Sequence, residues 1–123
     1  MVMRNDVNPD KPDRQGRTPL SWTSMSGHEG IVRMLLERND VNPGKPDKDQ
    51  RTPLSWASRN GHEGVARMFP ERNDVNPNKE DKWCRTPLSR AGESGHEGVV
   101  RVLLERNDVD TDKPDKLCLT PLS

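Results

Sequence analysis

Apolar and polar positions follow a helical spacing in two short stretches of the chain, and the first lies just after Thr18-Pro19. Thr can cap the free N–H groups at a helix start, and proline at the first helical position has no N–H to leave unpaired. Leu20, Thr23 and Ser24 then fall on one face at i, i+3, i+4 spacing. Gly27 can adopt the left-handed conformation that ends a helix. We therefore predict a short first helix that ends just before this glycine.

A second, more apolar helix is expected from about Glu29 to Arg38. Glu29 suits the positive N-terminal end of a helix, and Arg38 suits the negative C-terminal end. The stretch from Val41 to Lys48 follows and contains two prolines, which forbid continued helix and indicate an extended connection. The apolar positions of the second helix are Ile31, Val32, Met34, Leu35 and Leu36.

The sequence pattern of these two helices recurs along the chain with a period of 34 residues. Thr-Pro-Leu-Ser stands at 18–21, 52–55, 86–89 and 120–123, Gly-His-Glu-Gly at 27–30, 61–64 and 95–98, and Arg-Asn-Asp-Val at 4–7, 38–41, 72–75 and 106–109. A fixed period of this length is typical of stacked-repeat proteins. One unit has too few large apolar side chains to offset the entropy of ordering its backbone, so neighbouring units must supply the remaining burial.

This period predicts a single domain over residues 1–123. It would hold complete units at 13–46, 47–80 and 81–114, with a partial unit at 1–12 and another at 115–123.

Two departures from the repeated pattern predict local strain. Pro70 stands where Leu36 and Leu104 stand in the other units, late in the second helix, so we expect that helix to kink or end early. Gly16, in the turn before the first helix, is replaced by Gln50, Cys84 and Cys118 in the later units. If this position requires a positive φ, each replacement is strained.

The two cysteines, Cys84 and Cys118, lie one period apart and so occupy equivalent places in adjacent units. Packed helices of neighbouring units lie about 8–10 Å apart. A disulfide needs Cα atoms within roughly 4.4–6.8 Å. We therefore expect two free thiols, as in a reducing compartment.

Composition narrows the possible environments. The 20 basic and 20 acidic side chains cancel, so there is no overall attraction to nucleic acid or to an anionic membrane. No apolar run approaches the length of a spanning helix, and residues 1–10 lack the apolar stretch of a secretory signal. We expect a cytoplasmic or other intracellular protein that binds neither nucleic acid nor membrane.

The repeated sequence resembles the sequence pattern of the ankyrin repeat family. The family's Thr-Pro-Leu-His-X-Ala is matched by Thr52–Ala57 except for Ser55, its Gly-His and apolar run by Gly95–Leu104, and its turn before Thr-Pro-Leu by Asp13–Leu20. A tetratricopeptide unit also has this length but lacks the Thr-Pro start and the long proline-rich return loop. The resemblance implies an all-α helix–turn–helix solenoid with β-turn and loop connections, three full repeats and partial terminal repeats.

The same resemblance implies a non-catalytic module or scaffold for protein–protein interaction. Partners in the family contact the turn tips and the concave face of the first helices. Carried onto this chain, the expected contact residues are Arg14, Gln15, Arg17, Met25, Lys48, Asp49, Arg51, Arg59, Asn60, Lys82, Trp83, Arg85 and Glu93. The copies differ from one another at these positions, which fits either a tuned contact surface or unconstrained surface drift.

The most specific of these expectations concern the three tryptophans. Trp83, at a solvent-facing turn, fits an interface anchor, with local packing against the proline-rich loop as the alternative. Trp22 and Trp56 lie one period apart and are interpreted mainly as packing between repeats. Arg90 holds the third equivalent position, so we expect that contact to end there.

No catalytic, cofactor or metal site is expected. The only histidines, His28, His62 and His96, fall at one repeat position. Neighbouring copies should lie about 10 Å apart, too far to share a metal whose ligands lie about 2 Å from it. A triad needs groups from distinct positions, whereas Ser, His and Glu here recur in register.

Basic residues also recur in register, and their meaning is left open by the sequence. The three columns are Lys11, Lys45, Lys79 and Lys113, then Arg14, Lys48, Lys82 and Lys116, and then Arg17, Arg51 and Arg85. Stacking would turn each column into a ladder that an acidic partner could bind. The aspartates at 13, 47, 81 and 115 form an equally regular ladder, which favours a solvated, salt-bridged edge instead.

The partner of such a module is a protein of unknown identity, and the chain is expected to be a monomer or part of a longer repeat array. The alternative is a degenerate or truncated fragment of a larger array with no independent function. Pro70, the lost turn glycines and the absence of polar capping repeats support that alternative.

Overall fold

The computed structural model describes residues 9–111, which form six helices. The helices are α1 (Pro19–Ser26), α2 (Glu29–Leu36), α3 (Pro53–Asn60), α4 (Glu63–Met68), α5 (Pro87–Glu93) and α6 (Glu97–Leu104). No strand occurs among the described residues. The predicted all-α class and the pairing of a first with a second helix are confirmed.

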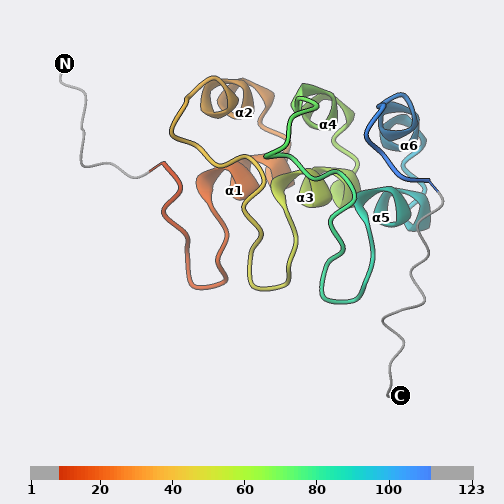
Figure 1. Cartoon of the computed structure of the whole chain (residues 1–123), viewed down its shortest axis with the longest axis horizontal. Helices are drawn as coiled ribbons and strands as arrows, with labels where there is room; N and C mark the ends of the chain where they lie inside the picture. Colours follow the sequence, from red (N-terminus) through yellow and green to blue (C-terminus); the bar gives the residue numbers. More distant parts are fainter. Residues whose placement is uncertain (1–8, 112–123) are drawn as a thin grey trace.

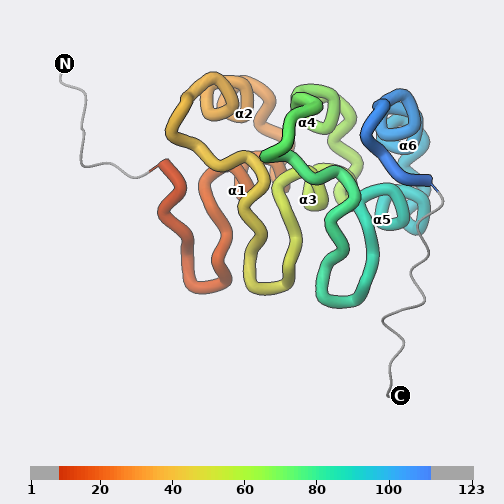
Figure 2. The backbone as a smooth tube through the Cα atoms, viewed as in Figure 1, coloured from red at the N-terminus to blue at the C-terminus, as the bar shows by residue number. Residues whose placement is uncertain are grey.

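The helices lie in two rows. Figure 1 shows α1, α3 and α5 side by side in one row and α2, α4 and α6 in the other. Each first helix packs on its own second helix, and α3 packs on both α1 and α5. The tube in Figure 2 shows three long hairpin loops that project beside one another beyond the row of first helices. The stack therefore presents its loops and first helices along one common edge.

Each first helix begins as the Thr-Pro pairs predict. The hydroxyls of Thr18, Thr52 and Thr86 accept a hydrogen bond from the backbone N–H three residues later. That third residue is a serine in every repeat, and its hydroxyl lies 3.3 Å from the Thr hydroxyl. The serine that replaces the family's histidine is thus tied to the helix cap, which is satisfied within the repeat.

The core lies between the two rows and runs without a break through the three repeats. Leu20 and Leu54 are 1% exposed, and Val32 and Val65 are fully buried. The other members of the cluster are Val41, Ala57, Ala66, Phe69, Val75, Ala91, Val99, Val102 and Leu103. Because each repeat contributes only a few of these side chains, burial depends on the neighbouring repeat.

Pro70 has the predicted effect on the second helix of the middle repeat. α4 ends at Met68, and Phe69 is already extended, whereas α2 and α6 continue for the equivalent of two further residues. Arg106 donates hydrogen bonds to the carbonyls of Phe69, at 2.5 Å, and Pro70, at 3.2 Å. The next repeat thus supplies donors to carbonyls near the shortened end.

The turn position of Gly16 does require a positive φ. Gly16 has φ 79°, and its replacements Gln50 and Cys84 have φ 63° and 61°. The expected strain at these two residues is confirmed, because side chains with a Cβ are disfavoured in this region. The third replacement, Cys118, lies outside the described residues.

The expectation of free thiols is wrong for Cys84, which is disulfide-bonded. That expectation used the spacing of packed helices, but Cys84 lies in a turn. Neighbouring turns here are joined by backbone hydrogen bonds, such as Lys82 N–H to Asp49 O at 2.9 Å. Hydrogen-bonded backbones lie about 4.7–4.9 Å apart, which is within the range a disulfide spans. Cys118 lies outside the described residues.

Candidate functional site

The candidate site is the edge of the stack formed by the turn tips and the adjoining sides of α1, α3 and α5, which we call the inner face. Each tip is built around one aspartate. Asp13 accepts hydrogen bonds from the backbone N–H groups of Gln15 and Arg17, both at 2.9 Å. Asp47 and Asp81 make the same pair of bonds in the next two tips. The regular aspartate column is therefore explained by turn formation.

Consecutive tips are hydrogen-bonded to each other. Lys48 N–H donates to Gln15 O at 2.8 Å, and Lys82 N–H donates to Asp49 O at 2.9 Å. The Lys82 ammonium also lies 3.5 Å from the Asp49 carboxylate. The tips are thus held in register, and so are the side chains they present.

The second carboxylate oxygen of each turn aspartate binds a side chain of the first helix. Trp22 Nε1 donates to Asp13 at 2.8 Å, and Trp56 Nε1 donates to Asp47 at 2.8 Å. In the third repeat, Arg90 donates from Nε to Asp81 at 2.9 Å. In this repeat a guanidinium N–H therefore replaces the indole N–H on the equivalent aspartate.

Indoles and guanidiniums alternate across the three repeats. The Arg17 guanidinium carbon lies 5.5 Å from the ring centre of Trp22 and 5.1 Å from that of Trp56. Arg51 lies 4.8 Å from the ring centres of both Trp56 and Trp83. These distances fit cation–π contacts. We call Trp22, Arg17, Trp56, Arg51 and Trp83, in this spatial order, the Trp–Arg stack.

The Trp–Arg stack is buried in its centre and open at its ends. Trp56 is 5% exposed, whereas Trp22 is 44% and Trp83 47% exposed. The interpretation of Trp22 and Trp56 as contacts between repeats agrees with this arrangement, since Arg17 links them. Trp83 contacts cations: besides Arg51, the Lys82 ammonium lies 5.2 Å and the Arg90 guanidinium 5.7 Å from its ring centre.

Positive charge accumulates beside this stack. Burial lowers the pKa of the Arg51 guanidinium, and the like charges of Arg90 and Arg59 lower it further. Asp81 partly offsets this repulsion, since it lies 3.4 Å from Arg51 Nε and 2.8 Å from an Arg90 nitrogen. Burial raises the pKa of Asp81, but hydrogen bonds from the Arg85 backbone and the Arg90 side chain outweigh it, so that the pKa lies below its ordinary value.

The structure brings most of the predicted contact residues together on the inner face. Arg14, Gln15, Lys48, Lys82 and Trp83 are exposed at the tips, and Asp49 and Arg17 are partly exposed. Arg51 is the exception among the tip residues. It is 8% exposed because two indoles cover its guanidinium.

The predicted helix positions divide into two groups. Met25 and Asn60 are joined across the repeats, since Asn60 Nδ2 donates to Met25 O at 3.0 Å, and neither is fully exposed. Arg59 is exposed, and its guanidinium lies 5.7 Å from the Trp56 ring centre. Arg85 and Glu93 are paired with each other by a salt bridge.

Trp22 and Arg90 belong to the same surface but were not among the predicted contact residues. A sequence signal for them exists: each lies nine residues after a turn aspartate, at Asp13 and Asp81, as does Trp56 after Asp47. This nine-residue spacing can be interpreted only when the structure shows that the second carboxylate oxygen of the turn aspartate faces the first helix.

The histidines join adjacent repeats. His62 Nε2 lies 2.9 Å from Met25 O, and His96 Nε2 lies 3.1 Å from Arg59 O. Their rings cover Gly27 and Gly61, the glycines that end the preceding first helices. These contacts give His62 and His96 a structural role between repeats. Among residues 9–111 no group of His, Cys, Asp or Glu side chains could hold a metal ion.

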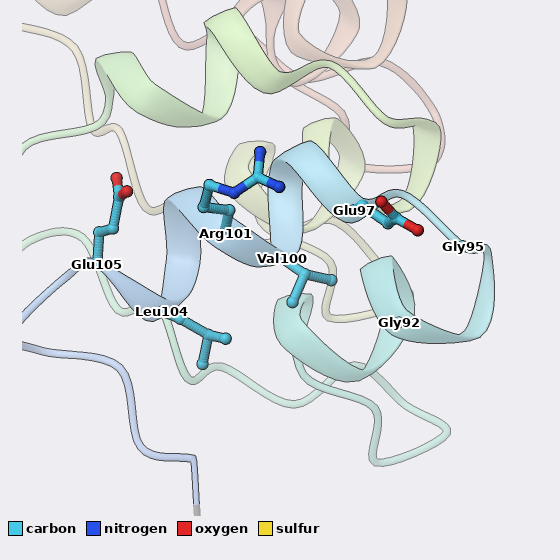
Figure 3. A pocket seen from close by; sticks show the side chains of 7 residues that line it. All are labelled: Gly92, Gly95, Glu97, Val100, Arg101, Leu104 and Glu105. Carbon is cyan, nitrogen blue, oxygen red and sulfur yellow. The ribbon is translucent and has the colours of Figure 1, made fainter.

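A separate hollow lies on the face of α5 and α6 that points away from the other repeats. It is an open pocket of about 480 Å³. Figure 3 shows Val100 and Leu104 pointing to the same side of α6, with Gly92 and Gly95 nearby. Gly95 is the equivalent of Gly61, which a histidine covers, but a Cβ at Gly95 would touch nothing within 4 Å among residues 9–111.

Comparison with known families agrees with this geometry. The family model for ankyrin repeats, which holds three copies, matches residues 1–81 and 41–115. Together these matches cover most of the chain, and the chain belongs to the ankyrin repeat family. Members of this family generally act as protein–protein interaction modules and are typically not enzymes. The comparison with curated proteins finds no match.

Within residues 9–111, none of the helices combines the length and the apolar character that a membrane span requires.

Proposed function

We propose that this chain is a non-catalytic binding module that holds a protein partner on its inner face, through the turn tips and the first helices. The observation that carries the proposal is the Trp–Arg stack with its two half-exposed indoles. Tryptophan and arginine are the side chains most often found as energetic anchors of protein interfaces. Here they are held by hydrogen bonds and ring contacts before any partner arrives, which lowers the entropy lost on binding.

The polar groups nearest to a catalytic pattern support the non-catalytic part of the proposal. Each first-helix serine, such as Ser55, is bonded into a helix cap, and its hydroxyl lies 3.3 Å from Thr52 Oγ1. His62 and His96 reach main-chain carbonyls of the preceding repeat. Catalytic work would require these groups to face a common substrate position, and their hydrogen bonds direct them into the structure instead.

The partner-binding test uses paired double variants. Partners would be captured by cross-linking, identified by mass spectrometry, and then titrated as purified proteins against the folded module. Trp83→Ala with Arg59→Ala removes an anchor and a cation from the inner face, and we expect at least a tenfold loss of affinity. Ile31→Ala with Arg33→Ala is the matched control, because both side chains are exposed on α2 in the other row.

Equal losses in both double variants, or no loss in either, would overturn the placement of the site. The second candidate, a degenerate array fragment with no independent function, rests on Pro70 and on the strained turns at Gln50 and Cys84. It predicts a molten or aggregating chain, whereas a working module unfolds reversibly and cooperatively with a clear helical circular-dichroism signal.

A further inference from the structure

We propose that the partner segment held on the inner face is an acidic, extended peptide whose carboxylates bind the guanidiniums of Arg17 and Arg59. This inference rests on the proposed function and specifies the chemistry of the partner.

The first argument is the local balance of charge. The chain as a whole is neutral, but cations outnumber carboxylates on the inner face. Its cations are Arg14, Arg17, Lys48, Arg51, Arg59, Lys82, Arg85 and Arg90, and its carboxylates are Asp13, Asp47, Asp49, Asp81 and Glu93. A surface of this sign attracts an acidic segment and raises its association rate.

The second argument is that the central carboxylates are not accessible to a ligand. The side chains of Asp47 and Asp81 are each 1% exposed. Both oxygens of each carboxylate already accept hydrogen bonds, from turn N–H groups and from Trp56 or Arg90. The turn aspartates therefore hold the cations in place without presenting a negative surface of their own in the middle of the stack.

The third argument is unused donor capacity. An arginine carries five N–H donors. The Arg17 side chain is 23% exposed, and its Nε, which lies 4.0 Å from Asp47, has no hydrogen-bond partner among residues 9–111. Arg59 is exposed, stacks on Trp56, and forms no salt bridge with any residue in the described range. A partner carboxylate would bind the accessible N–H groups of these two arginines, and at Arg59 it would also offset the repulsion that this arginine exerts on Arg51.

The geometry of the stack sets the spacing of the acidic residues. Arg17 and Arg59 lie 5.1 Å and 5.7 Å from the ring centre of Trp56, so their guanidinium carbons are at most about 11 Å apart. In an extended polyproline-II segment, residues i and i+3 point to the same side about 9 Å apart. A peptide with a glutamate at every third position therefore matches neighbouring arginines, and the half-exposed Trp22 and Trp83 would pack against the residues between.

An acidic peptide fits better than a nucleic acid. Asp49 and Glu93 stand at the rim of the inner face, with side chains 31% and 39% exposed. These carboxylates would repel the continuous phosphates of a nucleic-acid strand, whereas a peptide can place uncharged residues beside them. Single-stranded RNA is therefore the appropriate competitor.

The experiment uses a fluorescein-labelled nine-residue peptide with glutamate at positions 2, 5 and 8 and alanine elsewhere, and a twin peptide with glutamine in place of glutamate. Binding to the full chain is measured by fluorescence anisotropy at low and physiological salt. We expect the glutamate peptide to bind at least tenfold more tightly than its twin and to weaken as salt increases. Arg59→Gln should weaken binding at least fivefold, and the control Arg33→Gln, which removes the same charge from α2, should not.

Equal binding of the two peptides, no binding of either at millimolar concentration, or unchanged binding by Arg59→Gln would overturn the acidic-segment proposal. So would a nine-nucleotide uridine RNA that binds more tightly than the glutamate peptide. If a captured protein partner depends on Trp83 but is insensitive to Arg59→Gln and to salt, only the acidic chemistry fails and the proposed function stands. If the inner-face double variant leaves every partner bound, the proposed function itself fails.

Discussion

At the level of single residues, the glycines that end the first helices have two separate roles. Gly61 and Gly95 adopt the same left-handed conformation, with φ 80° and 75°. A Cβ at Gly61 would approach Nδ1 of His96 to 2.6 Å, whereas a Cβ at Gly95 would touch nothing within 4 Å in the described part of the chain. The chain thus contains its own control for separating backbone strain from contact between repeats.

Substituting the two glycines by alanine tests this separation. Gly95→Ala should cost about 1–2 kcal/mol, from the left-handed backbone alone. Gly61→Ala should cost an additional amount of about 1–3 kcal/mol, because the His96 ring is fixed by its bond to Arg59 O and cannot easily move. Urea unfolding of both variants gives the difference. Equal losses of stability in the two variants would mean that the His96 ring can move aside and does not join the repeats rigidly.

Asp81 is the carboxylate of the inner face that pairs with both Arg51 and Arg90. Its pKa is lowered in the folded protein, so it is more stabilising when ionised. The contribution is complete above the unfolded pKa of about 4 and is lost as the pH falls through the lower, folded pKa. Asp81→Asn should therefore destabilise the protein by about 2 kcal/mol at pH 7.

The same variant has a signature in its pH dependence. The stability difference between Asp81→Asn and the parent chain should shrink as the pH falls below about 4, because the parent then loses the same charge. Urea unfolding from pH 7 to pH 2.5 measures it, with the exposed Glu37→Gln as a control for simple loss of a carboxylate. A difference that is constant with pH would show that the ion pairs with Arg90 and Arg51 are not its source.

At the level of elements, the shortened helix α4 shows what one proline changes. Its helix ends at Met68, and Arg106 from the next repeat binds the carbonyls of Phe69 and Pro70. The sequence predicted the early end, because proline cannot continue a helix. It did not predict the response of Arg106, since that arginine occurs at the same place in every unit and only the three-dimensional stack shows which carbonyls it reaches.

Pro70→Leu should restore the helix of the middle repeat. We expect α4 to lengthen towards Leu36 and Leu104 in the other repeats, with a higher helical circular-dichroism signal and about 1–2 kcal/mol more stability. This gain is smaller than the full cost of a helical proline, because Arg106 already compensates part of it. Pro46→Leu, in an exposed loop, should add no helix. A loss of stability in Pro70→Leu would show that the extended end is required by the stack.

At the level of the whole molecule, the period predicted a stacked-repeat protein, and the resemblance to the ankyrin repeat implied the all-α class. The Thr-Pro pairs predicted the helix starts at Thr18, Thr52 and Thr86, and the replacement of Gly16 predicted the strained turns. An error arose where two repeats meet. The spacing between helices was applied to Cys84, which lies in a turn where backbones are much closer. Sequence periodicity places equivalent residues but does not give the distance between them, which differs between the tips and the helices.

The periodicity also predicts how stability is distributed along the stack. α3 packs on α1 at one side and α5 at the other, and six of its residues are buried, compared with three in α1 and two in α5. In a stack held together by nearest neighbours, opening the central unit breaks interfaces on both of its sides, whereas opening an outer described unit breaks its one interface with the central unit. Hydrogen exchange measured by mass spectrometry should therefore find the amides of α3 slowest, ahead of α1 and α5. Equal protection in all three would indicate all-or-none unfolding of the stack, and slower exchange in α5 would mean that its outer face is covered in solution by something that stabilises it as a neighbouring repeat does.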